Sequence, residues 1–318
     1  MHRVFALTVT ILVSSLAALA QQPQSTPPPP PPTSTPLPQP QTIRPVGRRA
    51  SDSNFGRGSV SESDRLEFRV VMLNTLVDPL YRKPTNKEMA VLTPSSKVLV
   101  QYAAFLDTPN TGVFRLVPDA GCAASDKVIN ASEECLKYSM PGGGNSFSFR
   151  ARTHRIKRLA DITLIDDKLI ITGIFMHGMV ANVGEVPIES ISLRSPGLKF
   201  LTDFQPSTNS EGVNEIYNRL LIGVEQDGYR YSHEATAIEN STYIFRSVAY
   251  RGKVLRSVRG FAYNELDYDK REDVIVAFRV AERLSDGSVT IVWKQFTDRE
   301  SPKIKIPKAN AQDASENR

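Results

Sequence analysis

The segment VIVAFRVAERLSDGSVTIVWKQF (residues 274–296) carries the strongest fold signal in the chain. Two runs rich in β-branched and aromatic residues, 274–283 and 288–296, lie on either side of Asp286-Gly287. An Asp-Gly pair supplies the positive φ that a tight hairpin needs, so this segment predicts two antiparallel strands.

Weaker hairpin signals lie upstream. Residues 162–165 and 169–175 flank a pair of aspartates, and residues 220–224 and 229–231 flank an Asp-Gly pair. Turn signals about every ten residues favour antiparallel pairing over βαβ units. One alternative stays open, because the apolar residues of segment 213–221 also have helical spacing.

Helical signals gather at the N-terminal end of the folded region. Residues 85–88 form a capping box, with Thr85 as the cap and Glu88 reaching back. Residues 95–106 have apolar side chains at helical spacing, and residues 66–77 allow a third helix. The expected fold class is α+β: predominantly antiparallel β, in sandwich-like sheets of hairpins, with short helices at the N-terminal end of the folded region.

Residues 1–20 are typical of a signal peptide. Arg3 supplies a positive start, an apolar run follows, and Ala18 and Ala20 provide the small residues that a signal peptidase requires. The alternative is an uncleaved helix that anchors the protein in a membrane. The signal predicts export to the periplasm or the medium, with no transmembrane span once it is cleaved.

Residues 21–64 differ in composition from everything that follows. The first part is rich in proline, which predicts an extended polyproline II spacer, and the second part is rich in Gly and Ser. Beyond it we expect helices followed by a β-rich region over 65–205, a hairpin-rich region over 206–307 that is either a second domain or part of the same one, and a disordered tail over 308–318.

The composition excludes several classes of protein. The 39 Lys and Arg against 34 Asp and Glu leave a modest positive charge, and 40% apolar and 23% charged residues are ordinary for a soluble domain. Collagens, coiled coils and polytopic membrane proteins do not have this composition. The two cysteines, Cys122 and Cys135, predict one structural disulfide in an exported chain, with two free thiols or half of a metal site as the alternatives.

Histidines are the first candidates for catalysis. His154, His177 and His233 remain after the signal peptide, and we take His177 and His233 as the candidate catalytic residues. The zinc-protease pattern that His233-Glu234 begins fails, because Ala237 stands where the second histidine belongs. His177 lies in an apolar run that is more typical of a core histidine.

The densest acidic segment, 264–273, offers a candidate cation site. Glu265, Asp267 and Asp269 would share one face of an extended chain, and carboxylates that converge can bind calcium. The calcium-loop pattern is incomplete, however, and Lys270 and Arg271 can neutralise the acids. The sequence therefore favours a solvated, ion-paired loop and no metal.

The densest basic segment, 150–158, contains Arg150, Arg152, Arg155, Lys157 and Arg158. Such a run can bind a polyanion, although the wet face of a strand and its turn is the simpler interpretation. Nucleic acid is a poor fit, because no aromatic residue lies inside the run and the chain carries an export signal.

No phosphate loop, nucleophile elbow or metal-binding motif is present in the sequence. We therefore expect an exported, non-catalytic, β-rich protein that binds a ligand or associates with the cell envelope, without a cofactor. Its partner would be an envelope surface or an acidic polymer. The alternative is an extracytoplasmic hydrolase whose histidine and carboxylate meet only in the fold.

Overall fold

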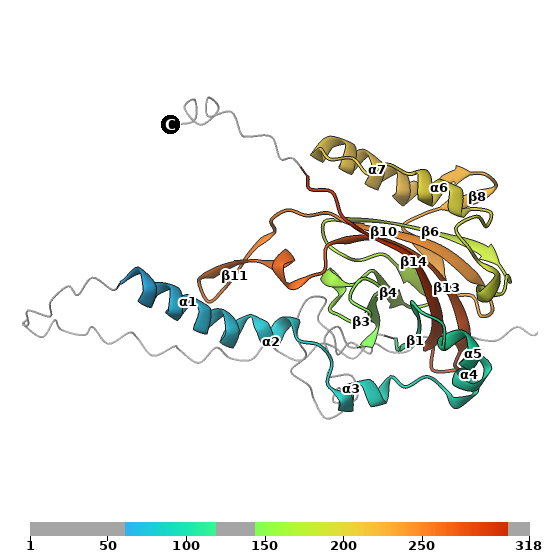
Figure 1. Cartoon of the computed structure of the whole chain (residues 1–318), viewed down its shortest axis with the longest axis horizontal. Coiled ribbons are helices and arrows are strands. Elements are labelled where there is room, and N and C mark those ends of the chain that lie inside the picture. The colour runs from blue at the N-terminus through green and yellow to red at the C-terminus, as the bar shows by residue number, and fades with distance from the viewer. Residues whose placement is uncertain (1–60, 119–143, 305–318) are drawn as a thin grey trace, which may run out of the picture. The chain divides into compact units, whose positions relative to one another are not determined.

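The computed structural model describes residues 61–118 and 144–304. It contains two main sheets of five strands each, and the one with the longer strands is called the larger sheet. The predicted Asp-Gly hairpin forms the centre of this larger sheet (Figure 1). Its strands are β13 (Glu272–Arg283) and β14 (Val289–Glu300), paired antiparallel along their length. The hairpin prediction is confirmed.

The turn of this hairpin differs in detail from the expected one. Gly287 takes a positive φ of +82°, whereas Asp286 does not, and the Gly287 N–H donates to the carbonyl oxygen of Leu284 at 3.0 Å. The turn is a three-residue loop with a left-handed glycine, the next commonest hairpin connection after the two-residue turns.

Strand β13 is buried on both faces. Val274, Val276 and Phe278 point into the core between the two sheets, whereas Ile275 and Ala277 point to the outer face of the larger sheet. A strand covered on both faces must be apolar at consecutive positions, and this explains the unbroken apolar run in the sequence.

All the strand pairs within the two main sheets are antiparallel. The larger sheet has the order β1-β14-β13-β10-β6 and the smaller one β3-β2-β4-β5-β9. The remaining strands of the larger sheet are β1 (Thr111–Leu116), β6 (Met176–Gly184) and β10 (Thr242–Ala249). The smaller sheet contains β2 (Ser146–Ser148), β3 (Thr153–His154), β4 (Ile162–Ile165), β5 (Lys168–Ile170) and β9 (Glu234–Thr236).

The main core lies between these two sheets. Phe149 contacts both Phe245 and Phe278, with ring centroids 5.5 and 5.9 Å apart, and all three are fully buried. Strands from before and after residue 205 share the larger sheet, so the described parts of segments 65–205 and 206–307 form one structural unit.

Among the described residues, five helices precede β1, in agreement with the expected α+β class. The capping box at Thr85 and Glu88 is present, and the predicted helix over 95–106 is split in two at Tyr102. The first helix begins at Glu62, within the last residues of the segment expected to be a spacer. The five are α1 (Glu62–Leu76), α2 (Asp78–Tyr81), α3 (Asn86–Val91), α4 (Ser96–Gln101) and α5 (Ala103–Leu106).

Two further helices, α6 (Leu198–Asp203) and α7 (Ser210–Ile222), cover the outer face of the larger sheet (Figure 1). The helical alternative for segment 213–221 is thus correct, and the predicted strand 220–224 is wrong. Leu220 faces the sheet, and the strand begins only after the helix-ending Gly223. The Asp227-Gly228 turn then joins β7 (Val224–Gln226) to β8 (Tyr229–Tyr231).

A two-stranded ribbon, β11 (Leu255–Val258) and β12 (Phe261–Asn264), pairs only with itself. It lies against α1, with the ring centroids of Phe68 and Phe261 5.9 Å apart. We call α1 and this ribbon together the arm. Figure 1 shows the arm extending away from the two sheets.

Three 3-10 turns complete the described structure: η3 (Lys157–Leu159), η4 (Ile188–Ser190) and η5 (Glu265–Tyr268). Among the helices of the described ranges, none combines the length and the apolar character needed to cross a bilayer.

Candidate functional site

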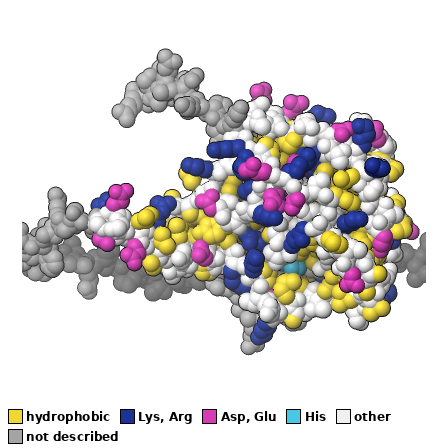
Figure 2. Space-filling view, in the orientation of Figure 1, with side chains coloured by type: hydrophobic (Ala, Val, Ile, Leu, Met, Phe, Trp, Pro, Cys, Tyr) yellow, Lys and Arg dark blue, Asp and Glu magenta, His cyan; other side chains and the backbone are white. Residues whose placement is uncertain are grey.

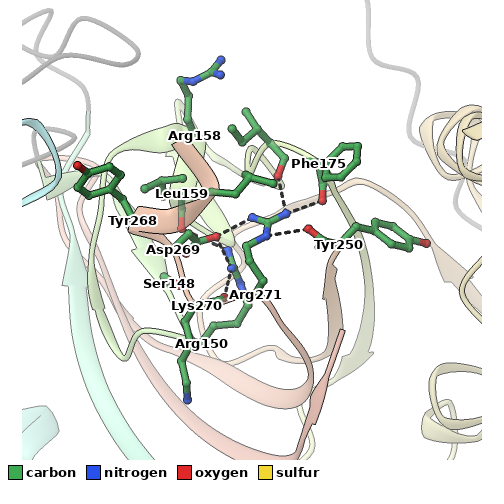
Figure 3. A network of polar contacts seen from close by, with 12 residues as sticks. Ser148, Arg150, Arg158, Leu159, Phe175, Tyr250, Tyr268, Asp269, Lys270 and Arg271 are labelled. Atoms are coloured by element: carbon green, nitrogen blue, oxygen red, sulfur yellow. Dashed lines mark hydrogen bonds and ion pairs between the residues drawn. The ribbon is translucent and has the colours of Figure 1, made fainter. Parts of the chain in front are cut away.

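The basic and acidic segments singled out in the sequence fold against each other. Arg150 Nη1 lies 2.6 Å from Asp269 Oδ2, and Arg158 Nη2 lies 2.7 Å from Glu265 Oε2. Figure 3 shows Arg150 and Arg271 converging on Asp269. The two segments form one ion-paired network.

Local backbone geometry turns Arg150 inward. Strand β2 ends at Ser148, and the chain turns immediately afterwards. Arg150 and Arg155 are buried, which corrects the interpretation of the basic run as the wet face of a strand. Of the five predicted polyanion-binding residues, only Arg152 is exposed to solvent.

The other basic residues are also engaged. Arg152 donates to Asn110 Oδ1 at 2.9 Å and lies over the ring of Trp293. Lys157 is half-buried in η3. The run 150–158 therefore does not form an exposed polyanion patch.

The three candidate calcium ligands do not converge. Residues 265–268 form η5, and three residues per turn send their side chains in different directions, whereas the prediction assumed an extended strand. Glu265 and Asp269 turn inward onto arginines, and Asp267 accepts a hydrogen bond from Asn264 Nδ2 at 2.6 Å. The loop is ion-paired, as expected, but the side chains of Glu265 and Asp269 are buried rather than solvated.

Asp161 is the centre of this network, and the sequence analysis missed it. Its carboxylate accepts from Arg150 Nε at 2.8 Å, from Ser247 Oγ at 2.6 Å and from Ser148 Oγ at 3.1 Å. Ser247 belongs to the larger sheet and Ser148 to the smaller one, so Asp161 links the two. An acid inside an apolar run was the available signal, since a buried carboxylate requires partners.

Electrostatics favour the charged state of Arg150 despite its burial. Desolvation alone lowers the pKa of Arg150, but Asp161 and Asp269 outweigh it and raise the pKa above its usual value. Burial lowers the pKa of Arg271, which also donates to the carbonyl oxygens of Phe175 and Tyr250 at 2.6 and 2.9 Å. The guanidinium groups of Arg150 and Arg271 thus bind acids and carbonyl oxygens within the protein and are not available to a ligand.

His177 uses both of its ring nitrogens. Nε2 lies 2.8 Å from the carbonyl oxygen of Val213, and Nδ1 lies 3.0 Å from the hydroxyl of Tyr250. A carbonyl only accepts, so Nε2 carries the proton and Nδ1 accepts from the tyrosine. Burial lowers the pKa of His177 to about 4, which keeps the ring neutral at pH 7.

A cavity of about 530 Å³ lies beside His177, between β6 and the N-terminal half of α7. Tyr217 of α7 lines the same cavity, and the ring of His233 packs edge-on against Tyr217 with centroids 5.3 Å apart. The fold therefore brings the two candidate histidines to the same region. Burial lowers the pKa of His233 as well.

Neither His177 nor His233 is paired with a carboxylate among the described residues. No carboxylate lies within hydrogen-bond distance of His177 or His233 in the described ranges, and the same holds for His154. The ring of His154 is fully buried, its Nδ1 lies 3.0 Å from the carbonyl oxygen of Ser146, and burial lowers its pKa to about 4. A histidine without an orienting acid and with a depressed pKa is a weak general base.

Three other predictions fall outside the described residues: the Cys122–Cys135 disulfide, the export signal with nearly all of its spacer, and the tail over 308–318. Among the described residues, the cavity beside His177 lies close to both predicted catalytic candidates. Comparison of the chain with protein-family models, with curated proteins and with solved structures finds no match.

Proposed function

We propose that this chain is an exported, non-catalytic protein that binds a ligand or associates with the cell envelope, carried on a proline-rich spacer. One observation supports it most: His177, the better buried of the catalytic candidates, has both ring nitrogens bonded to structural partners. A general base must be free to take a proton from a substrate.

The charged residues support the same proposal. The side chains of Arg150, Asp161 and Asp269 are fully buried, and Arg150 pairs with both acids, which joins the two sheets and η5. Paired, solvent-excluded charges of this kind are structural elements, and a substrate would have to displace a partner in order to reach them.

The sequence supplies the remaining support. The signal peptide directs the chain out of the cytoplasm, and the proline-rich stretch 27–40 spans roughly 43 Å at about 3.1 Å per residue in a polyproline II helix. A stiff spacer of that length separates a folded module from the surface that holds it.

The alternative is an extracytoplasmic hydrolase, and the cavity beside His177 favours it. Tyr217 lines that cavity and also contacts His233, so a substrate in the cavity would lie near both residues. The hydrolase would need a carboxylate that moves toward one of these rings when substrate binds.

One experiment separates the two functions. The purified chain is incubated with isolated cell-envelope material, and the fraction of protein that sediments is measured together with low-mass products released into the supernatant. We expect retention without release of products. Release of low-mass products that disappears in the His233→Ala variant would establish the hydrolase instead. The control is Glu239→Ala, a substitution at an exposed residue.

Export is tested separately. N-terminal sequencing of the protein recovered from its native host is expected to start at Gln21. A chain that starts at Met1 and sediments with membranes would favour the anchored alternative.

A further inference from the structure

The ribbon of the arm carries an unusually basic sequence. Residues 251–264 (RGKVLRSVRGFAYN) contain four Lys and Arg and no Asp or Glu. This segment places two basic residues, Lys253 and Arg259, on the surface.

Strand alternation separates the ribbon into two faces. Lys253, Leu255, Ser257 and Arg259 are exposed, whereas the residues between them are half-buried. Leu255 and Ser257 are alternate residues of β11 and share its outer face, whereas the exposed Lys253 and Arg259 lie just before and just after the strand, at the two ends of that face. Leu255 is 73% exposed at the centre of it.

The turn places Arg259 at the tip of the ribbon. Arg259 and Gly260 both have positive φ, +46° and +85°, and the flanking Val258 and Phe261 pair directly. Two consecutive residues with positive φ are the pattern of a type I′ turn. Such a turn keeps the ribbon tight, and Arg259 is exposed at its tip.

The other face of the ribbon is covered by α1. Phe261 packs against Phe68, and Arg69 Nη2 donates to the carbonyl oxygen of Ala262 at 2.9 Å. Only the outer face, defined by Lys253, Leu255, Ser257 and Arg259, is therefore open to a partner.

Two of the basic side chains on this segment are not neutralised. Arg251 pairs with Glu300, and Arg256 lies 3.9 Å from Glu265. Among the described residues, no ion pair involves Lys253 or Arg259. The outer face thus presents two unpaired positive charges on either side of an exposed leucine.

Apolar side chains continue along the arm. Leu66, Phe68, Val70 and Val71 of α1 are between 48% and 63% exposed, and Figure 2 shows hydrophobic side chains along the arm. A hydrated acidic polysaccharide has no apolar phase in which such groups gain by leaving water. The interface of a lipid bilayer offers both an apolar boundary and anionic headgroups.

We propose that the outer face of the β11–β12 ribbon docks this protein on an anionic phospholipid membrane. Lys253 and Arg259 contact phosphate headgroups while Leu255 enters the boundary between headgroups and acyl chains. The inference rests on the proposed envelope association and names the membrane surface as its partner.

Vesicle sedimentation with the full chain tests the proposal. Binding is measured to phosphatidylcholine vesicles with and without phosphatidylglycerol, and the ratio of the two binding constants is the readout. An N-terminal apolar segment that partitions into lipid affects both vesicle types, so the ratio reports the anionic preference.

Charge variants provide the first comparison. Lys253→Gln with Arg259→Asn, which keeps a residue tolerant of positive φ at the tip, is expected to lower binding to anionic vesicles by about 30-fold, since each basic group near such a surface contributes about a factor of five. The control Lys87→Gln with Arg194→Gln removes the same charge from exposed positions elsewhere and is expected to change binding by less than about twofold.

A matched pair tests the apolar contribution. Leu255→Thr is expected to weaken binding roughly fivefold. Val100→Thr, at a position that is 77% exposed compared with 73% for Leu255, should have no effect. Urea unfolding midpoints confirm that every variant is folded.

Three results would overturn the proposal. The first is equal binding to both vesicle types, which would leave the envelope association to another part of the chain. The second is equal loss in the ribbon and control variants. The third is binding to soluble dextran sulfate that falls in the charge variant, together with unchanged vesicle binding in Leu255→Thr, which would identify an acidic polymer as the partner.

Discussion

Replacement of Arg150 by methionine tests whether the buried ion network holds the two sheets together. The side chain of Arg150 is fully buried and donates to the carboxylates of Asp161 and Asp269 and to the carbonyl oxygens of Leu159 and Lys270. Methionine has a long side chain that can fill much of the same space but donates no hydrogen bond.

The expected loss of stability follows from the two buried carboxylates that lose Arg150 as a partner. Asp161 keeps its two serine hydroxyls, and Asp269 keeps Arg271 at 2.6 Å, so both acids stay buried with fewer donors. Removing one partner from a buried charge network costs about 3–5 kcal/mol. That is a large fraction of the roughly 5–15 kcal/mol that stabilises a typical domain.

Urea unfolding provides the assay, followed by the fluorescence of the single Trp293 and by far-UV circular dichroism. With a slope of about 3 kcal/mol per molar urea, the unfolding midpoint of Arg150→Met is expected to fall by about 1–1.7 M. The control is Arg152→Met, the same chemical change at an exposed side chain, which should cost less than about 1 kcal/mol.

The reasoning would be refuted if the two methionine variants unfolded at the same urea concentration. A double-mutant cycle adds a second test. Arg150→Met combined with Asp269→Asn should cost at least about 1 kcal/mol less than the sum of the single changes, because each single change already breaks the Arg150–Asp269 pair and its loss is counted only once in the double variant. Simple additivity would show that the two residues act independently.

Three other predictions concern the histidines and two glycines. Burial holds the pKa of both His154 and His177 at about 4, below the ordinary value of about 6.5 for histidine, so the unfolded chain takes up protons first as the pH falls. Stability should therefore decrease between pH 6.5 and 4, by up to about 1.4 kcal/mol per pH unit for each histidine, and equal urea midpoints at pH 7 and pH 5 would contradict this. Gly112→Ala should cost about 1–3 kcal/mol and alter the emission of Trp293, because a Cβ there would lie 2.7 Å from the indole nitrogen; an unchanged midpoint would show that the ring moves freely. Gly287→Ala should cost about 1 kcal/mol through its φ of +82° alone, and a changed Trp293 emission would argue against that cause.

The candidate sites were predictable only in part. The sequence identified His177 and His233, and the fold brings both to the region of Tyr217. It gave no indication that Val213 and Tyr250 would bond to both nitrogens of His177. These partners lie 36 and 73 residues away, and no local spacing relates them.

Charge patterning was the least reliable guide. The run 150–158 has the higher density of basic residues, yet Arg150 and Arg155 are buried, whereas the sparser segment 251–259 exposes Lys253 and Arg259. Whether a charged residue faces water depends on what packs against its strand, and that is a property of the whole fold.

Short-range interactions account for what the sequence by itself determined. The capping box at Thr85 and Glu88, the turn at Gly287 and the apolar run of β13 each depend on residues a few positions apart, so local pattern was sufficient to establish α+β with antiparallel hairpins. Only the tertiary structure decided the rest. Arg150 and Asp269 are 119 residues apart and become partners because two sheets and a 3-10 turn exclude water around them. Burial of a charge requires a partner at close range, and the partner is set by packing rather than by position in the chain.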